Sequence, residues 1–419
     1  MYRNCCDRIA MTTPSRKPYA APPLVGDRTA SNVHDRDTLA VHAGRSDLTD
    51  LGVHAPPLDL STTNPLGDVE TGGAAYEHLA AGHPPRPGDP NVYARLWNPT
   101  VARFEAAVAQ MEGGEAGIGF ASGMAAMSAT LIALTRDGRD HVVAVRPLYG
   151  GTDHLLATGL LGTRVTFAPP EEVAAAITPR TALVIAETPA NPTLDLLDLR
   201  ALVAAAGEVP VLIDNTFATP VLQRPLDHGV SIVLHSATKF LGGHGDALGG
   251  IVVTDEESAT RIRPIRALTG GVLSPFAAYL LHRGVPTLPI RVRAQQDHAT
   301  RLAAHLAAHP AVRRVFHPSL PGCDPTGLVG PGRQMAGPGS LLAFELADGY
   351  EAAATTAKRV RLITHAVSLG GVDTLIEHPA AVTHRPVSGD AKPAAGILRL
   401  SVGLESPGDL IADLDQALS

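Results

Sequence analysis

The sequence predicts an α/β protein in which a large, mostly parallel sheet domain is followed by a small α+β C-terminal domain. Three observations predict this fold. Short apolar runs between about 98 and 290 lack polar alternation, as strands do when both faces of a sheet are covered. Helical patterns lie between several of these runs, which is typical of parallel sheets. Beyond residue 290 the pattern changes to an Ala-rich helix and short strands.

The elements follow in order along the chain. Residues 1–35 are Pro-rich and aperiodic, so we expect a flexible tail, and residues 36–97 carry scattered Gly and Pro, so we expect an extended arm. The strands of the large domain (98–290) are expected at 141–145, 164–168, 182–187, 209–214, 231–235 and 249–253, with helices at 125–134, 152–161 and 197–206. The C-terminal domain (291–419) is expected to hold helices at 294–309 and 351–363, and strands at 341–346 and 397–402.

Composition excludes several classes of protein. The length of 419 residues suggests two or three domains at about 150 residues each. A net charge of −7 and an aromatic content of 4% argue against nucleic acid as the main partner. The three cysteines (Cys5, Cys6 and Cys323) form no disulfide framework, and no apolar stretch reaches the roughly 18 to 20 residues that span a bilayer. We therefore expect a soluble cytoplasmic protein; Met11 offers an alternative start, which would remove residues 1–10.

Polar residues follow three of the predicted strands. The segments are Glu187 to Pro192, Asp214 to Thr216 and Ser236 to Lys239. Ligands of open α/β sheets bind at the carboxyl ends of the strands. We therefore expect these segments to face one crevice.

Lys239 is the most informative of the four lysines. Lys17 lies in the tail, Lys358 on an expected exposed helix face and Lys392 in a Gly/Pro loop, whereas Lys239 follows a buried strand. Burial lowers the pKa of a lysine, and an uncharged amine in a crevice is what Schiff-base chemistry needs. On the lysine alone, an ordinary strand-end lysine paired with a carboxylate is an equally good interpretation.

The neighbours of Lys239 favour pyridoxal phosphate, which needs a lysine, a carboxylate for its ring nitrogen and donors for its phosphate. Asp214 can supply the carboxylate, and Ser236 and Thr238 can donate to phosphate. A further phosphate cradle is expected at 119–126 (GFASGMAA), which precedes a helical pattern, because glycine lets backbone N–H groups approach the phosphate at a helix N-terminus.

Three other kinds of site have less support in the sequence than a pyridoxal-phosphate site. The glycines at 117, 119 and 123 imitate a dinucleotide fingerprint, but their spacing is wrong and no preceding strand is convincing. His235, His244 and Asp246 lack the spacing of metal ligands, so we expect no metal there. No GxSxG motif occurs, which argues against a hydrolase of that type.

Eight motifs in order resemble the Cys/Met-metabolism family of pyridoxal-phosphate enzymes, which includes cystathionine γ-lyase, cystathionine γ-synthase and methionine γ-lyase. They are YARLWNPT (93–100), FASGMAA (120–126), PLYGGT (147–152), ETPANPTLD (187–195), DNTFATP (214–220), SATKFLGGHGD (236–246), AVSLGG (366–371) and LRLSVGLE (398–405). The resemblance covers about 38–417. It implies the aspartate-aminotransferase-like fold (fold type I), pyridoxal 5'-phosphate as cofactor and an amino-acid substrate.

The resemblance also implies roles for particular residues. Lys239 would hold the cofactor covalently and shuttle protons, Asp214 would pair with the ring nitrogen, and Tyr149 would stack on the ring. The phosphate would be bound by Gly123, Met124, Ser236 and Thr238, with Tyr93 and Arg95 reaching the phosphate of the neighbouring subunit. The substrate carboxylate would be bound by Asn191, Ser368 and Arg399. The arm would then contact a neighbouring subunit in a homotetramer, a dimer of dimers with shared active sites.

The family performs both elimination and replacement with the same residues. We expect γ-elimination on a sulfur amino acid, with a γ-replacement synthase as the alternative and a non-catalytic cofactor-binding or scaffold protein as a remote one. Gly151 stands where methionine γ-lyases typically have cysteine, which weighs against a dedicated methionine lyase. Val367 stands where cystathionine-processing members often have glutamate, which weighs against an enzyme specialised for cystathionine. The segment 242–246 resembles the methionine-lyase and sulfhydrylase branches more. Trp97 could narrow the entrance or pack at an interface.

Overall fold

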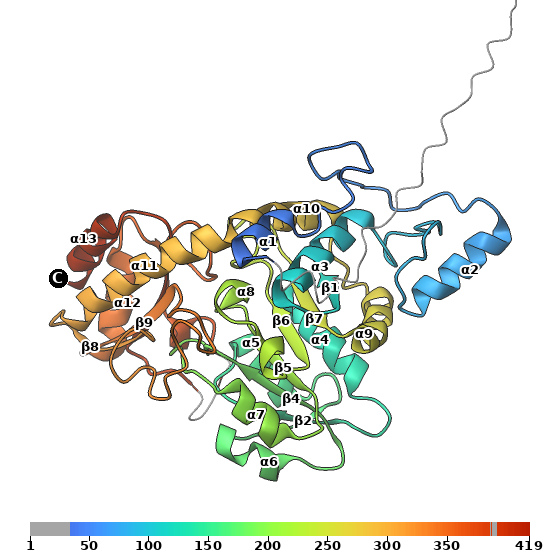
Figure 1. The fold of residues 1–419 in the computed structure, drawn as a ribbon. Helices are drawn as coiled ribbons and strands as arrows, with labels where there is room; N and C mark the ends of the chain where they lie inside the picture. The colour runs from blue at the N-terminus through green and yellow to red at the C-terminus, as the bar shows by residue number, and fades with distance from the viewer. Residues whose placement is uncertain (1–33, 386, 388–391) are drawn as a thin grey trace, which may run out of the picture.

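The computed structural model describes residues 34–385, 387 and 392–419, so the predictions for the N-terminal tail and for Met11 lie outside the described residues. The first helix of the described residues is α1 (Arg36–His42), and a later segment holds helix α2 (Val69–Ala80). Figure 1 shows α2 projecting at the end of the molecule opposite to the C-terminal helices. Within the described ranges, no helix is both long enough and apolar enough to cross a membrane.

A seven-stranded sheet forms the centre of the large domain, with strand order β1-β7-β6-β5-β4-β2-β3. Its strands are β1 (Ala116–Phe120), β2 (His141–Ala144), β3 (Arg164–Phe167), β4 (Thr181–Glu187), β5 (Val211–Asp214), β6 (Ile232–His235) and β7 (Gly250–Thr254). The pairings from β3 through β6 are parallel, whereas β7 runs antiparallel to both of its neighbours. The six strands expected in this region are all present, and the mostly parallel α/β fold is confirmed.

Helices cover both faces of this sheet (Figure 1). They are α3 (Pro99–Glu112), α4 (Gly123–Leu134), α5 (Gly150–Thr158), α6 (Val173–Ala176), α7 (Leu199–Ala206), α8 (Thr219–Leu222), α9 (Glu256–Thr269) and α10 (Pro275–Gly284). Alternate residues of β2 and β4 enter two separate apolar clusters: Val143 and Val184 pack with α3 and α7, whereas Val142 and Leu183 pack with α4, α5 and α9. Burial on both faces explains why the strand sequences are continuously apolar.

The C-terminal part has its own five-stranded sheet in the order β10-β11-β12-β9-β8. Its strands are β8 (Val312–Phe316), β9 (Leu341–Leu346), β10 (Thr364–His365), β11 (Leu375–Glu377) and β12 (Ile397–Ser401), and its helices are α11 (Leu288–Ala307), α12 (Gly349–Arg359) and α13 (Pro407–Leu418). A third apolar cluster joins this sheet to the three helices. Residue 291, the predicted start of this domain, lies in the first turn of α11.

Two local predictions were wrong. A buried strand, β1, does precede the glycine-rich turn at 121–123, and a twelve-residue helix, α2, lies in the segment expected to be extended. The glycines of β1 hide its pattern because α3 packs closely on it: a Cβ on Gly117 would lie 2.4 Å from the Glu105 carbonyl oxygen. Helix α2 begins at Asp68, whose carboxylate accepts the N–H of Thr71 as a helix cap.

Candidate active site

A cavity of about 300 Å³ opens at the carboxyl ends of β4, β5 and β6, where the segment that follows β10 closes over the sheet. Its lining includes ten of the predicted site residues, which are Gly123, Met124, Tyr149, Asn191, Asp214, Ser236, Thr238, Lys239, Ser368 and Arg399. The three strand-end segments singled out in the sequence therefore do face one crevice, as expected for an open α/β sheet.

The amine of Lys239 lies in this cavity, in the loop that connects β6 to β7. Its Nζ donates a 2.6 Å hydrogen bond to Ser368 Oγ. Burial, reinforced by the positive charge of Arg399, lowers the pKa of Lys239 from 10.5 to about 8. A fraction of the amine is therefore uncharged near neutral pH, so that it can act as a nucleophile.

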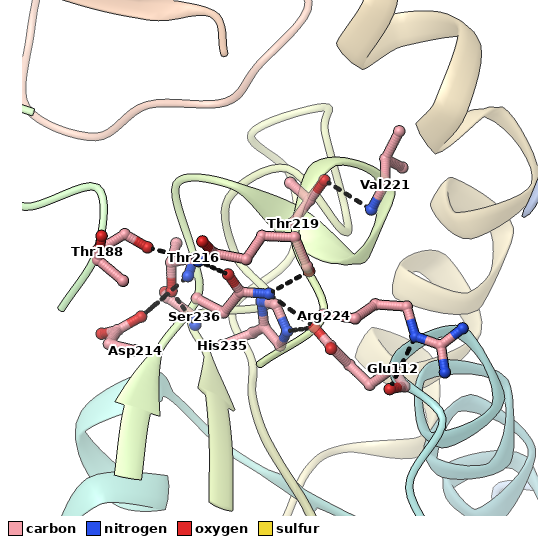
Figure 2. A network of polar contacts seen from close by, with 11 residues as sticks. Glu112, Thr188, Asp214, Thr216, Thr219, Val221, Arg224, His235 and Ser236 are labelled. Atoms are coloured by element: carbon pink, nitrogen blue, oxygen red, sulfur yellow. Dashed lines mark hydrogen bonds and ion pairs between the residues drawn. The ribbon is translucent and has the colours of Figure 1, made fainter. Parts of the chain in front are cut away.

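Asp214 ends β5 and faces the cavity, held by Thr216. Its Oδ1 accepts the backbone N–H of Thr216 at 3.0 Å and the Thr216 hydroxyl at 2.5 Å. The same hydroxyl oxygen accepts the N–H of Ser236 at 2.8 Å, which fixes the end of β6 relative to β5 (Figure 2). Burial raises the pKa of Asp214, and the two bonds from Thr216 oppose that rise. A cation bound beside Asp214 would favour its ionised form.

Figure 2 also shows a buried network behind the ends of β5 and β6. His235 Nε2 and Glu112 Oε1 are 2.6 Å apart, and Asn215 Nδ2 donates to the same carboxylate oxygen at 2.9 Å. His244 Nδ1 is hydrogen-bonded to the Gly242 carbonyl oxygen. Among residues 34–385, 387 and 392–419, no three His, Cys, Asp or Glu side chains gather as metal ligands would.

The segment that precedes α4 forms a cradle for an anion. Ser122 caps the helix through a hydrogen bond from the Ala125 N–H to its hydroxyl, so the helix N-terminus faces the cavity at Gly123 and Met124. A Cβ on Gly123 would lie 3.2 Å from the Cβ of Ser236, which explains the glycine. Backbone N–H groups at a helix N-terminus and nearby hydroxyls are the donors that phosphate groups prefer.

Arg399 forms the second polar end of the cavity. Its Nη1 donates to Asn191 Oδ1 at 3.0 Å, and its Nη2 donates to the Ser368 carbonyl oxygen at 2.9 Å. Nη2 also pairs with Glu377, which lies opposite Arg399 in the antiparallel register of β11 and β12. Its Nε is buried without a hydrogen-bond partner among the described residues. Such an arginine can still receive a carboxylate.

Tyr149, Tyr93 and Arg95 differ in their relation to the cavity. Tyr149 precedes α5, and its ring lines the cavity with 40% of the residue exposed. Tyr93 and Arg95 are outside the cavity lining; Arg95 lies over the Tyr93 ring at 5.4 Å and donates to the Ala267 carbonyl oxygen. Trp97 is buried against α2 and is absent from the cavity lining of its own chain.

Glu187, Glu377 and Leu248 are among the cavity residues to which sequence reasoning assigned no role. Glu187 ends a predicted strand and belongs to a segment expected to face the crevice, but its residue type alone indicates no role. Glu377 belongs to a three-residue strand that has no clear periodicity, so nothing in the sequence indicated its pairing with Arg399. Leu248 lies in the loop after Lys239 and is 68% exposed at the cavity mouth.

The residues present fit pyridoxal 5'-phosphate. One end of the cavity offers a helix N-terminus and hydroxyls for a phosphate, the middle offers an amine of lowered pKa and a carboxylate, and the other end offers an arginine with a free Nε. Fold and site together define a pyridoxal-phosphate-dependent enzyme of fold type I that acts on an amino acid.

Comparison with known proteins identifies the family. The model of the Cys/Met metabolism PLP-dependent enzyme family matches residues 37–419, and the chain belongs to this family. It is 59% identical over 382 residues to an L-methionine gamma-lyase of Brevibacterium sandarakinum, covering 91% of this chain and 97% of that protein. It is 54% identical over 387 residues to an L-methionine gamma-lyase of Streptomyces avermitilis, covering 91% and 88%.

Solved structures give the same result. The metB structure of Corynebacterium glutamicum has a TM-score of 0.83 at 35% identity, covering 93% of this chain and 98% of that one. Cystathionine gamma synthase of Xanthomonas oryzae pv. oryzae has a TM-score of 0.81 at 34% identity, covering 92% and 98%. The predicted family, fold, cofactor and class of reaction, γ-elimination on a sulfur amino acid, are confirmed.

Gly151, which stands where methionine γ-lyases typically have cysteine, lies in the first turn of α5. A side chain at this position has a direct cost here, because a Cβ on Gly151 would lie 2.6 Å from Cε1 of Tyr149 and 3.3 Å from Sδ of Met124. A cysteine would therefore require the Tyr149 ring to move. The glycine lets the ring lie close to the start of α5.

Proposed function

We propose that this chain is an L-methionine γ-lyase that converts methionine and water into methanethiol, 2-oxobutanoate and ammonia. The observation that carries the proposal is the apolar mouth of the cavity. Val367 and Leu248 line it and are 51% and 68% exposed, whereas the charged lining residues lie deeper. A methylthio group suits such a mouth, whereas the distal ammonium and carboxylate of cystathionine would find no charged partner there.

The relatives named L-methionine gamma-lyase, at up to 59% identity, support the same substrate. When bound, pyridoxal phosphate supplies the electron sink that makes the protons of the substrate carbon chain acidic. The chain's own residues then bind, orient and move protons.

Each site residue has a proposed task. Arg399 and Asn191 hold the substrate carboxylate, with the free Nε of Arg399 completing a bidentate contact. Lys239 Nζ carries the proton between Cα and Cβ, and Ser368 Oγ orients that amine. Tyr149 exchanges a proton with the departing sulfur. Asp214 keeps the ring nitrogen of the cofactor protonated. The cofactor phosphate is bound by Gly123, Met124, Ser236 and Thr238.

We also propose that the active enzyme is a cytoplasmic homotetramer, a dimer of dimers with shared sites. Tyr93 and Arg95 lie outside their own cavity, and Tyr93 is 40% exposed, which supports a contact of this pair with a neighbouring phosphate. The division into arm (36–97), cofactor domain (98–290) and C-terminal domain (291–419) is part of this proposal.

One experiment tests the activity. The holoenzyme is incubated separately with methionine, cystathionine, homocysteine and O-acyl homoserines, with and without a thiol, and products are identified by mass. Methanethiol and 2-oxobutanoate from methionine without added thiol are expected. A thioether formed only from an ester plus a thiol would instead establish a γ-replacement synthase, the alternative favoured by the structural likeness to cystathionine gamma synthase.

A further inference from the structure

Glu187 is a buried carboxyl group to which no task has been given above. It is the last residue of β4 and lies beside Asp214 in the parallel register of β4 and β5. Its side chain lines the cavity, yet only 7% of the residue is exposed. A carboxyl group in this position must be satisfied by donors from the protein.

Its two oxygen atoms accept hydrogen bonds from two different loops. Oε2 accepts the backbone N–H of Tyr149 at 2.7 Å, and Oε1 accepts the backbone N–H of Asn191 at 3.1 Å. Tyr149 begins the nine-residue helix α5 and makes no side-chain cap of its own. Glu187 therefore joins the start of α5 to the loop after β4.

The surroundings of Glu187 disfavour its ionised form. Burial, followed by the negative charge of Asp214, raises the pKa of Glu187 well above its usual value. Two adjacent buried carboxyl groups do not both ionise readily. The hydrogen bonds from the Tyr149 and Asn191 N–H groups oppose this rise, and these bonds, rather than its charge, connect Glu187 to the site.

We propose that Glu187 is a positioning residue that holds Tyr149 and Asn191 in fixed relation to each other. The tyrosine faces the reacting part of the site, and Asn191 contacts Arg399, the anchor for the substrate carboxylate. Glu187 thus links recognition of the carboxylate to placement of the tyrosine. The inference rests on the proposed function only in that the site binds an α-amino acid.

The test measures binding rather than turnover. Norleucine resembles methionine but has no γ-leaving group, and pentylamine is norleucine without the carboxylate. The ratio of their affinities for the holoenzyme, followed by cofactor absorbance, reports carboxylate recognition. Glu187→Ala should lower this ratio about tenfold, since losing a hydrogen bond that supports a charged contact costs about 1.5 kcal/mol. L-Alanine and ethylamine give the same comparison if methionine is not the substrate, so failure of the proposed function remains distinguishable.

Asp413→Asn is the matched control. Asp413 accepts three backbone N–H groups, from 361 to 363, and neither it nor this segment belongs to the cavity lining. It should lower stability and leave the affinity ratio unchanged. In an Asn191→Ala background, Glu187→Ala should lower the ratio no further, because both substitutions remove the same support.

Glu187→Gln keeps the side-chain volume but has one acceptor oxygen, so it releases one loop. We expect it to change one of two readouts. A change in the affinity ratio would show that Asn191 has lost its position, and a change in the pH dependence of cofactor absorbance would show that Tyr149 has. An unchanged ratio in folded Glu187→Ala, additive losses with Asn191→Ala, or a Glu187→Gln protein that changes neither readout would each overturn the proposal.

Discussion

Lys239 Nζ and Ser368 Oγ are joined by a 2.6 Å hydrogen bond, although the two residues are 129 positions apart. Lys239 lies between β6 and β7 of the large sheet, whereas Ser368 lies between β10 and β11 of the small one. Ser368 has a φ of +94°, a left-handed conformation that a serine rarely adopts. In this conformation the Ser368 hydroxyl accepts a hydrogen bond from the Lys239 amine, and the Ser368 carbonyl oxygen accepts one from Arg399.

The lowered pKa of Lys239 predicts how cofactor capture depends on pH. Only the uncharged amine attacks the aldehyde, so the rate should rise with pH through about 8 and then level off. An ordinary lysine would give a rise that continues toward 10.5. The rate of the visible absorbance change after adding pyridoxal phosphate to cofactor-free protein measures this, and Lys239→Ala should show no such change.

Arg399 is expected to contribute to both substrate binding and stability. Arg399→Ala should raise KM for methionine by at least tenfold, because the carboxylate loses its bidentate partner. It should also lower the free energy of unfolding by about 3–5 kcal/mol, because Glu377 is left buried and unpaired. Adding Glu377→Gln should recover part of the stability and none of the KM. Urea unfolding and steady-state kinetics separate the two effects; recovery of KM in the double variant would exclude Arg399 as the anchor.

Shared active sites predict complementation between inactive variants. Protein carrying Tyr93→Phe and Arg95→Ala should be inactive, as should Lys239→Ala. An equal mixture of the two should regain up to about a quarter of wild-type activity, because about half of its dimers are mixed and one of the two sites in each mixed dimer has every residue intact. Absence of any activity in mixed dimers confirmed by native mass spectrometry would show that the sites are not shared.

The apolar mouth predicts a specificity change. Val367→Glu places a carboxylate at a partly exposed position of the cavity lining, where it can meet the distal ammonium of cystathionine. The ratio of kcat/KM for cystathionine to that for methionine should rise about fivefold, since a partly exposed ion pair contributes about 1 kcal/mol. Val367→Gln, similar in size but uncharged, is the control. An equal rise in both variants would mean that charge is not responsible.

Much of the large domain could be predicted from the sequence because its strands are buried on both faces and their apolar runs stand out. Strand β1 could not be predicted, because its glycines allow α3 to approach closely and leave no continuous run of apolar side chains. Helix α2 carries Gly72 and Gly73, which weaken a helical pattern, and is held by its Asp68 cap.

The candidate site shows the same division. Lys239 and Asp214 could be found because each follows a predicted strand. Glu377 and Arg399 become partners only through the register of β11 and β12, which the sequence does not indicate. Contacts of this kind depend on tertiary pairing, and a linear pattern carries little information about them.

The antiparallel course of β7 has a consequence for how this scaffold can change. Because β7 returns directly beside β6, residues 236–249 leave and rejoin the sheet at one edge without a crossover helix. The loop ends near Leu248 at the cavity mouth. Insertions or deletions near Leu248 should alter which molecules enter the cavity, while the hydrogen bonds between β6 and β7 stay in place. This end of the loop is therefore the natural target for directed evolution of new substrate ranges.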